Sequence, residues 1–191
     1  MTKFIEKQIK ESIEIKQSIH NDVKMVKLIK KISKKIIKAY RNGNKTIIAG
    51  NGGSAADAQH ISAEFVGRFA FDRDALSSIA LTTDSSILTA VGNDYGYNKI
   101  FSRQIQANGQ KGDIFIAIST SGNSKNIIKA IKQAKSQNII TIGLTNKNGG
   151  KMKDLCDYSI SVPSTNTARV QESHIMIAHI ICALVENKLF K

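Results

Sequence analysis

The sequence predicts a three-layer α/β protein, in which a doubly wound parallel sheet is covered by helices on both faces and preceded by a pair of helices. Three observations carry this prediction. From residue 45 onward, short apolar segments alternate with helix-like segments, as in βαβ units. Residues 113–118, DIFIAI, are apolar nearly throughout, as a parallel strand buried on both faces should be. Before residue 45, apolar residues recur every three or four positions, which indicates helices.

The N-terminal region, residues 3–41, is predicted to be helical. Asn21-Asp22 interrupts it and supplies an N-cap for a second helix, and Gly43 is the expected C-cap. We expect residues 1–43 to be a helical extension of a single 1–191 domain. This amphipathic pair would pack on the α/β core or on a neighbouring subunit.

Five strands and the helices between them are expected along the rest of the chain. The predicted strands are residues 46–49, 78–82, 113–118, 139–144 and 158–162. The predicted helices are residues 54–66, 85–91, 97–108, 125–136, a short segment that ends at 156, and 167–189. Residues 93–96 are expected to break the chain, and Pro163, the only proline, to end the last strand. In such folds, ligands bind at the carboxyl ends of the strands.

Length and composition indicate an ordinary globular protein. The chain has 191 residues, 41% of them hydrophobic and 23% charged, which suits one domain with a sizeable core. No window of eighteen apolar residues predicts a membrane span, and the charged N-terminus does not resemble a secretory signal. Cys156 and Cys182 are too few for a disulfide scaffold, so we expect both to be reduced, buried thiols in a cytoplasmic protein.

The net charge of +13 is concentrated at the N-terminus. Residues 1–45 hold twelve lysines and one arginine against four acidic residues, a net +9. This region is either a surface for nucleic acid or an acidic partner, or a solvated helix face. Only five of the 28 basic residues are arginine, the preferred residue for bidentate contacts to phosphate and bases. The region also lacks aromatic residues interleaved with the lysines for base stacking. The solvated face is favoured, and nucleic acid is not expected as a partner.

The segment Ser119-Thr120-Ser121-Gly122-Asn123-Ser124 lies between a predicted buried strand and a predicted helix. Hydroxyls and free backbone N–H groups at a helix N-terminus favour an anion. The loop has no Lys or Arg and no GxxxxGK[ST] pattern, so a phosphate monoester suits it better than a nucleoside triphosphate. The alternative is an ordinary hydrophilic turn with Ser124 as the N-cap.

A second small-residue turn, GNGGS at 50–54, follows the first predicted strand. It is not the GxGxxG of a dinucleotide site, and its glycines would let backbone approach a ligand. Ser54 and Asp57 form a weak capping box that would start the next helix. Taken alone, this segment is as well explained by a tight βα turn.

Two predicted helices carry side chains suited to chemistry. His60, Glu64 and Arg68 lie at i, i+4 and i+8 on one helical face, and Gln171 and His179 share one face of the last helix. Where two such helices meet, His, Glu, Gln and His can hold a divalent metal or act as acid and base. The alternatives are an exposed His–Glu pair and a core histidine. His174 lies on a different face and is a weaker candidate, and His20 is expected to face solvent.

At these residues the sequence resembles a known family. GNGGSAADAQH (50–60), VGNDYG (91–96), FSRQ (101–104), ISTSGNS (118–124), NGGKM (148–152) and ARVQESH (168–174) stand in the order found in the SIS, or sugar isomerase, domain family. Within that family the chain is most similar to the phosphoheptose isomerases. The resemblance covers nearly the whole chain, including the two N-terminal helices.

The resemblance implies a cytoplasmic homotetramer that converts D-sedoheptulose 7-phosphate to D-glycero-D-manno-heptose 7-phosphate through an enediol. This is the first step towards the heptose of lipopolysaccharide cores or other surface polysaccharides. By the same resemblance, one Zn²⁺ per subunit is held by His60, Glu64, Gln171 and His179, and Glu64 and His179 are the acid/base pair. The positions that match substrate contacts are Asn51, Gly52, Gly53, Glu64, Arg68, Asn93, Asp94, Ser119, Thr120, Ser121, Ser124 and Gln171.

Two other functions belong to the same fold. One branch binds a replication initiator protein as a tetramer, and its members lack the acid and the histidine that match Glu64 and His179, both of which are present in this chain. A sugar-phosphate sensor without turnover is the other alternative. Some relatives have an acid where this chain has Ala168, a difference that would tune Arg169 or a subunit contact and removes none of the predicted catalytic groups.

Overall fold

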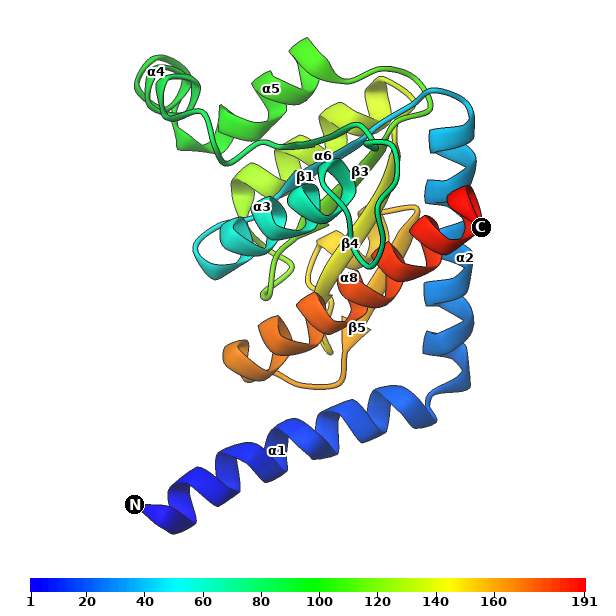
Figure 1. Ribbon diagram of the computed structural model, residues 1–191. Helices are drawn as coiled ribbons and strands as arrows, with labels where there is room; N and C mark the ends of the chain where they lie inside the picture. The colour runs from blue at the N-terminus through cyan, green and yellow to red at the C-terminus, as the bar shows by residue number, and fades with distance from the viewer.

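The computed structural model describes residues 1–191 and confirms the predicted three-layer α/β fold (Figure 1). The strands are β1 (Thr46–Ala49), β2 (Ser78–Ala80), β3 (Ile114–Ile118), β4 (Ile140–Asn146) and β5 (Tyr158–Val162). The helices are α1 (Thr2–Asn21), α2 (Val23–Arg41), α3 (Gly53–Val66), α4 (Ser85–Tyr95), α5 (Ile100–Asn108), α6 (Lys125–Ser136), α7 (Met152–Leu155) and α8 (Thr167–Phe190), with a 3₁₀ turn, η1 (Tyr97–Lys99), before α5.

The sheet is parallel throughout, in the order β2-β1-β3-β4-β5. The chain passes from β1 outward to β2 and then returns to place β3 on the other side of β1. The strand order therefore reverses between β1 and β3. In doubly wound folds, this reversal opens a crevice at the carboxyl ends of the two strands, where ligands bind.

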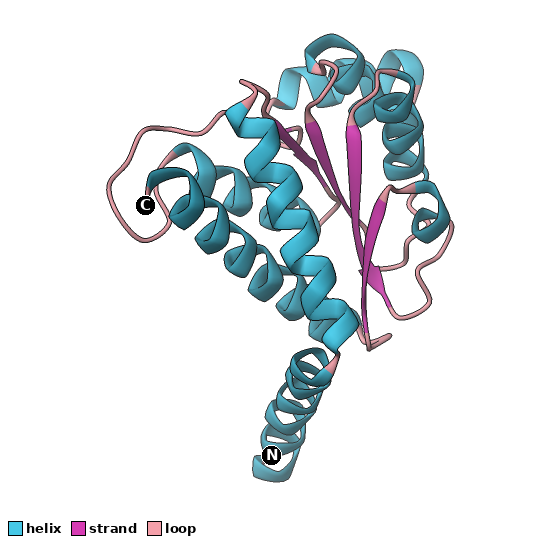
Figure 2. Cartoon of the chain, turned by 90° about the vertical axis from the view of Figure 1, so that its right-hand side faces the viewer, coloured by secondary structure: helices cyan, strands magenta, loops and turns pink.

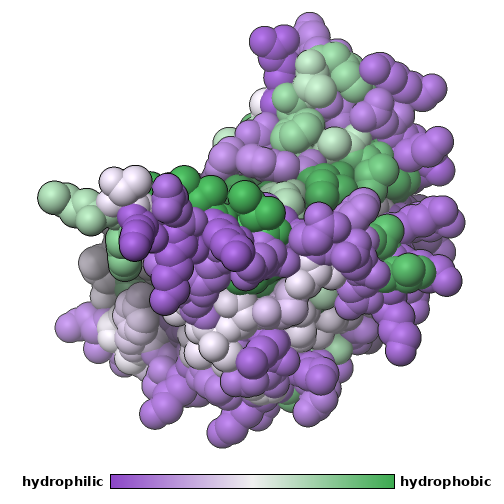
Figure 3. Space-filling model, turned by 90° about the horizontal axis from the view of Figure 1, so that it is seen from below, coloured by the Kyte–Doolittle hydropathy of each residue, from purple (hydrophilic) through white to green (hydrophobic).

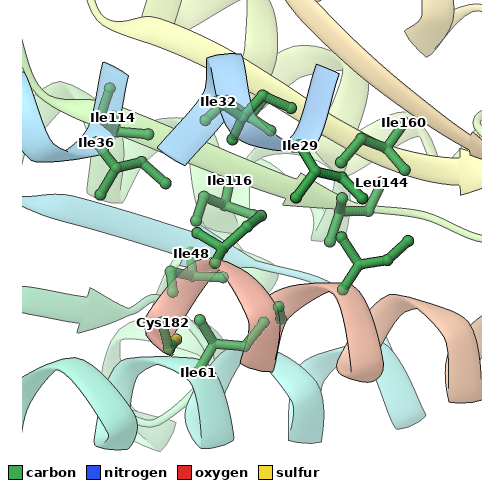
Figure 4. Close-up of a cluster of buried hydrophobic side chains, with 14 of the residues drawn as sticks. Ile29, Ile32, Ile36, Ile48, Ile61, Ile114, Ile116, Leu144, Ile160 and Cys182 are labelled. Carbon is green, nitrogen blue, oxygen red and sulfur yellow. The ribbon is translucent and has the colours of Figure 1, made fainter. Parts of the chain in front are cut away.

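Alternate strand residues enter two separate cores, because successive side chains point to opposite faces of a sheet. Ile114 and Ile116 join the cluster beneath α2, α3 and α8, and Figure 4 shows them among side chains from these helices. Phe115 and Ala117 join the second cluster, beneath α5 and α6. Helices consequently cover both faces of the sheet (Figure 2).

The N-terminal helices begin and end as predicted. The Asp22 carboxylate caps α2 by accepting hydrogen bonds from the backbone N–H groups of Lys24 and Met25, at 2.9 and 3.0 Å. Gly43 has φ +75°, a conformation that favours glycine after a helix end. Helix α2 packs on α8, whereas α1 buries only Ile19 and projects from the body of the molecule (Figure 1).

Two sequence predictions about helix ends are wrong. Helix α3 begins at Gly53, with Gly52 as its N-cap and no side-chain capping bond, so Ser54 and Asp57 do not form a capping box. Helix α4 runs to Tyr95, through the residues expected to break the chain, and ends at Gly96 with φ +83°. The continuous hydrogen bonding of α4, started by the Asp84 side chain, overrides the weak helix propensity of Asn and Asp.

Helix α8 is long and apolar enough to cross a membrane by length and composition. In the folded chain it packs against α2 and α3 and buries the ionisable Glu186, as the core helix of a folded domain does. Both cysteines are free, Cys182 fully buried and Cys156 partly buried rather than buried as expected. Burial raises the pKa of each thiol to about 12, so neither is a reactive thiolate near neutrality.

His174 is a core residue of α8. Its Nε2 donates to the carbonyl oxygen of Thr145 at 3.2 Å, and its buried Nδ1 has no partner. Burial lowers the pKa of His174 from 6.5 to about 4, because a charged imidazolium would lose its hydration there.

This histidine should make the protein less stable in acid. Between pH 6.5 and 4 the unfolded chain binds a proton at His174 that the folded chain does not, so the free energy of unfolding falls as the pH falls through this window. Between pH 7.5 and 4.5, the unaltered protein should lose about 2–3 kcal/mol more than His174→Gln, which keeps a donor but cannot titrate. Urea unfolding at the two pH values measures this difference, and equal losses would contradict it.

Candidate functional site

Two loops meet at the carboxyl ends of β1 and β3. Residues 50–52 follow β1, and residues 119–124 follow β3. Since β1 and β3 are neighbouring parallel strands, both loops lie at the same edge of the sheet. The glycine turn starts α3 on one face, and the serine loop starts α6 on the other.

The glycine turn requires residues without a Cβ at several positions. A Cβ at Gly50 would collide with the backbone oxygen of Ser54, and a Cβ at Gly53 would lie 2.6 Å from Nε2 of Gln171. Gly52 has φ +56°, which favours glycine. The turn therefore brings the start of α3 directly against Gln171 on α8.

Three predicted metal ligands converge further along the contact between α3 and α8. Nε2 of His60 lies 3.1 Å from Oε1 of Glu64 and 3.4 Å from Nε2 of His179. One ligand atom from each of the three residues lies within 4.8 Å of the other two. The rings of His60 and His179 meet edge to face, and the ring of Phe69 lies 5.6 Å from that of His179.

Gln171 is placed differently from these three. It lies against Gly53, at the first residue of α3, whereas His60 is two turns further along that helix. On α8, Gln171 and His179 are eight residues apart, a rise of about 12 Å. The structure thus brings together His60, Glu64 and His179, with Gln171 on the same helix–helix seam but nearer the glycine turn.

Asp57 also belongs to this seam, although its sequence position suggested only a helix cap. It stands one turn before His60, and its Oδ2 is buried without a hydrogen-bond partner. Burial raises the pKa of Asp57, and the nearby His60 and His179 offset part of the rise. The three-residue spacing from His60 was the available signal for this placement.

The serine loop gathers its hydroxyls at the start of α6. Oγ of Ser119 lies 3.0 Å from Oγ of Ser124 and 3.5 Å from Oγ of Ser121. Ser124 occupies the N-cap position, but its side chain caps no backbone N–H group of the helix. The N–H of Ile127 in the first turn of α6 donates to Oδ1 of Asn126 at 2.9 Å, so the hydroxyls of the loop are the groups that remain available to an anion.

The backbone of this loop is packed tightly from behind. Gly122 has φ +66°, and a Cβ there would collide with the backbone oxygen of Gly149. Gly150, with φ +55°, leaves equally little room beside the backbone oxygen of Ser121. The NGGKM segment therefore packs closely against the backbone of the serine loop. In the same loop, the carbonyl oxygen of Thr120 accepts a hydrogen bond from the backbone N–H of Asn146.

Asn126 connects the two loops and was not predicted. It is buried in the first turn of α6, and its side-chain amide pairs with that of Asn51, with N–O distances of 2.8 and 3.0 Å. The hydroxyl of Tyr97 donates to Oδ1 of the same Asn51 at 3.4 Å. A partly buried amide pair therefore holds the glycine turn to the start of α6, directly after the serine loop.

Three predicted contact residues lie at the periphery. Asn93 and Asp94 are exposed in the last turn of α4, where Nδ2 of Asn93 donates to Oδ1 of Asp94 at 2.8 Å. Arg68 is exposed just beyond α3, and its guanidinium forms no ion pair within the chain. None of the three contacts the other predicted site residues through a hydrogen bond within this chain.

A buried ion pair fixes the end of α3 that carries Glu64. Nε of Arg73 lies 3.1 Å from Oε1 of Glu186, and both side chains are almost fully buried. Arg73 also donates to the backbone oxygens of Glu64 and Phe65, each at 2.8 Å. Burial alone would raise the pKa of Glu186, but backbone N–H donors and Arg73 hold it below its usual range.

Comparison with known proteins identifies the family. The family model described as SIS domain matches residues 10–146, most of the chain. The chain belongs to the SIS domain family. Phosphoheptose isomerase 2 of Campylobacter jejuni is 60% identical to this SIS domain protein over 190 residues, which cover 100% of the chain and 94% of the relative. The phosphoheptose isomerase of Aneurinibacillus thermoaerophilus is 60% identical over 191 residues, covering 100% of the chain and 96% of the relative.

Solved structures agree with these relatives. The phosphoheptose isomerase of Neisseria gonorrhoeae superposes on this SIS domain protein with a TM-score of 0.91 and 39% identity, over 97% of this chain and 98% of that one. The enzyme of Francisella tularensis gives a TM-score of 0.93 and 34% identity over the same shares. With relatives this close along its full length, this SIS domain protein is an isomerase enzyme.

Proposed function

We propose that the protein is an aldose–ketose isomerase that converts D-sedoheptulose 7-phosphate to D-glycero-D-manno-heptose 7-phosphate. One observation carries the proposal. A carboxylate and two imidazoles, from Glu64, His60 and His179, converge on the seam between α3 and α8, and α3 itself starts beside a hydroxyl-lined loop that suits an anion. Relatives named phosphoheptose isomerase, 60% identical over the full chain, support this substrate.

The reaction requires two kinds of proton transfer. A base removes a proton from C1 of the ketose, and C2 of the enediol then receives a proton to give the aldose. Glu64 is suited to the carbon-bound protons, and His179 can move protons between the oxygens near neutrality. Glu64 has two carboxylate oxygens, so Oε1 can face His60 while the other oxygen faces the sugar.

The two loops would hold the ends of the substrate. Ser119, Ser121 and Ser124 would bind the phosphate together with the backbone of Thr120. Asn51, Gly52 and Gly53 would contact the sugar through exposed backbone. Such remote binding positions C1 and C2 against Glu64 and His179. Gln171, Arg68, Asn93 and Asp94 are assigned to further contacts on the family resemblance.

The donor set fits a zinc ion. Ligand atoms that share a tetrahedral ion at about 2.1 Å lie about 3.4 Å apart, close to the distances of His60 Nε2 from Glu64 Oε1 and from His179 Nε2. We assign these three residues as ligands of one Zn²⁺ per subunit. The family resemblance supplies Gln171 as the fourth ligand, which lies on the same seam but nearer the glycine turn. When bound, the ion would polarise the carbonyl and stabilise the enediolate.

Turnover with and without metal tests the proposal. Purified protein should convert sedoheptulose 7-phosphate to the aldose, as followed by NMR. Chelator treatment should lower the rate, and stoichiometric zinc should restore it. A folded, zinc-supplied protein that forms no aldose would overturn the assigned activity, and a rate indifferent to chelation would overturn the metal assignment alone.

The protein is further proposed to be a homotetramer. Ile5, Ile9 and Ile13 form an apolar stripe on α1 and are 57%, 56% and 59% exposed. Further along α1, a cavity of about 470 Å³ is lined chiefly by apolar side chains of α1, α2 and α8. From below, apolar surface forms a green band bordered by hydrophilic residues in purple (Figure 3). Apolar surface of this kind is typical of a protein–protein interface.

Substitution on this stripe should therefore disrupt assembly. Ile9→Lys is expected to shift the protein to smaller species in sedimentation velocity, because it places a charge in the interface. Ser18→Lys adds the same charge on the opposite, solvated face of α1 and should leave the assembly unchanged. A monomeric unaltered protein, or equal behaviour of the two variants, would argue against this interface.

In the cell, we place the enzyme in the cytoplasm, at the first step towards the heptose of a lipopolysaccharide core or another surface polysaccharide. Binding of an initiator protein is disfavoured, because Glu64 and His179 are both present and lie together with His60. A sensor would bind the sugar phosphate and release it unchanged, which the turnover assay distinguishes.

A further inference from the structure

A polar cavity lies between α5 and α6, which run side by side (Figure 1), and none of its lining residues belongs to the proposed isomerase site. Its volume is about 410 Å³, and none of its seven lining residues is hydrophobic. Four of them are cations, Lys99, Arg103, Lys129 and Lys132, and the others are Ser102, Gln106 and Gln133. Arg103 and Ser102 are the outward-facing half of the FSRQ segment, whose Phe101 and Gln104 are buried.

The four cations have no counter-charge in the chain. No carboxylate oxygen lies within 4.0 Å of any of them. Lys99 and Arg103 are four residues apart, and Lys129 and Lys132 are three residues apart. At these spacings the two like charges of each pair are neighbours on the helix surface and repel each other. Lys99 also occupies the N-cap of α5, where the helix dipole disfavours a cation. A bound anion would relieve all three unfavourable interactions.

A second cavity in the chain is also lined by four cations, but the positions of two of them at helix ends account for their charge. Lys34, Lys38, Arg41 and Lys188 line a cavity of about 490 Å³. Arg41 and Lys188 lie in the last turns of α2 and α8, where the helix dipole favours cations, and Arg41 donates to the carbonyl oxygen of Lys188 at 3.1 Å. The helix dipoles therefore account for much of that charge. Between α5 and α6, Lys99 and Arg103 lie over the ring of Tyr95, at 5.8 and 4.8 Å from its centroid, whereas the side chains of Lys129 and Lys132 have no hydrogen bond, ion pair or cation–π contact.

We propose that the cavity between α5 and α6 binds a small polyphosphate anion, that is, a diphosphate or triphosphate chain. A single phosphate carries about two negative charges and would neutralise only half of the four cations. The volume falls within the range of small-molecule sites, and the absence of hydrophobic side chains from the lining disfavours a ligand recognised mainly through its apolar surface. No lining residue belongs to the proposed isomerase site, so this binding is independent of the assigned reaction.

Calorimetric titration of the intact protein with inorganic tripolyphosphate tests the proposal. Lys129→Gln/Lys132→Gln should weaken binding at least about tenfold, since two of four close charges are lost. The matched control is Lys34→Gln/Lys38→Gln, which removes the same charge from the other cavity and should leave the affinity unchanged. Both double variants keep His60, Glu64 and His179, so any metal–polyphosphate interaction cancels in the comparison.

Three results would overturn the assignment. The first is no binding to the unaltered protein, and the second is an equal loss in the two double variants, which would indicate general charge attraction. The third is full affinity in Lys129→Gln/Lys132→Gln together with loss in Ser124→Ala, which would place the anion in the serine loop. Isomerase turnover, measured on the same samples, reports separately on the proposed reaction.

Discussion

Replacing Glu64 by glutamine is expected to lower kcat about 10²- to 10⁴-fold, the usual contribution of a positioned general base. Gln keeps the size and the hydrogen-bonding reach of the side chain but cannot accept a proton from carbon. The anion loop is untouched, so calorimetry should still detect sugar-phosphate binding by the variant. The expected signature is a large loss of kcat with little change in substrate affinity.

The matched control for this change is Glu14→Gln, which makes the same substitution at an exposed position on α1, beside Lys10. Its kcat should equal that of the unaltered protein. Turnover by Glu64→Gln within threefold of the control would remove Glu64 from the catalytic role. Loss of both turnover and sugar-phosphate binding would show instead that the carboxylate holds the site together.

Replacing Glu186 by glutamine is expected to lower the free energy of unfolding by about 3–5 kcal/mol, because it leaves the charge of Arg73 buried without a partner. The Glu186 carboxylate also accepts hydrogen bonds from the backbone N–H groups of Phe69 and Ala70, both at 2.8 Å. An amide group has one acceptor oxygen, so one of these donors would lose its bond. Urea unfolding measures the loss.

The exposed pair of Lys10 and Glu14, 3.9 Å apart, provides the control for this prediction as well. Glu14→Gln should change the free energy of unfolding by less than about 1 kcal/mol, as expected for a solvated ion pair. A loss in Glu186→Gln no larger than this would show that the buried pair contributes little. Because Arg73 bonds the carbonyl of Glu64, we also expect the folded fraction of this variant to turn over more slowly.

The sequence predicted those parts of the site that depend on local spacing. His60 and Glu64 share a helical face because they are four residues apart, and the serine loop was evident from its composition between a strand and a helix. The helical pattern of residues 167–189 predicted α8, and the facing position of His179 followed from pairing two such helices. The parallel sheet followed from apolar strands alternating with helices.

Other parts depended on packing between distant segments. Arg73 and Glu186 are 113 residues apart, and nothing in either local sequence marks the pair. The amide pair of Asn51 and Asn126 likewise depends on the reversal of strand order between β1 and β3. Gln171 lies against Gly53 because the glycine leaves room for it, which spacing along α8 alone did not reveal.

Conversion of sedoheptulose 7-phosphate in D₂O, followed by NMR, tests the central claim most directly. An isomerase working through an enediol should produce the aldose 7-phosphate with solvent deuterium at C2, because the proton delivered there exchanges with water on the catalytic base. Glu64→Gln should produce neither aldose nor labelled sugar at a comparable rate. If the folded, zinc-supplied protein binds the sugar phosphate and returns it unlabelled and unconverted, it is a sensor or a binding protein, and the proposed isomerase activity is wrong.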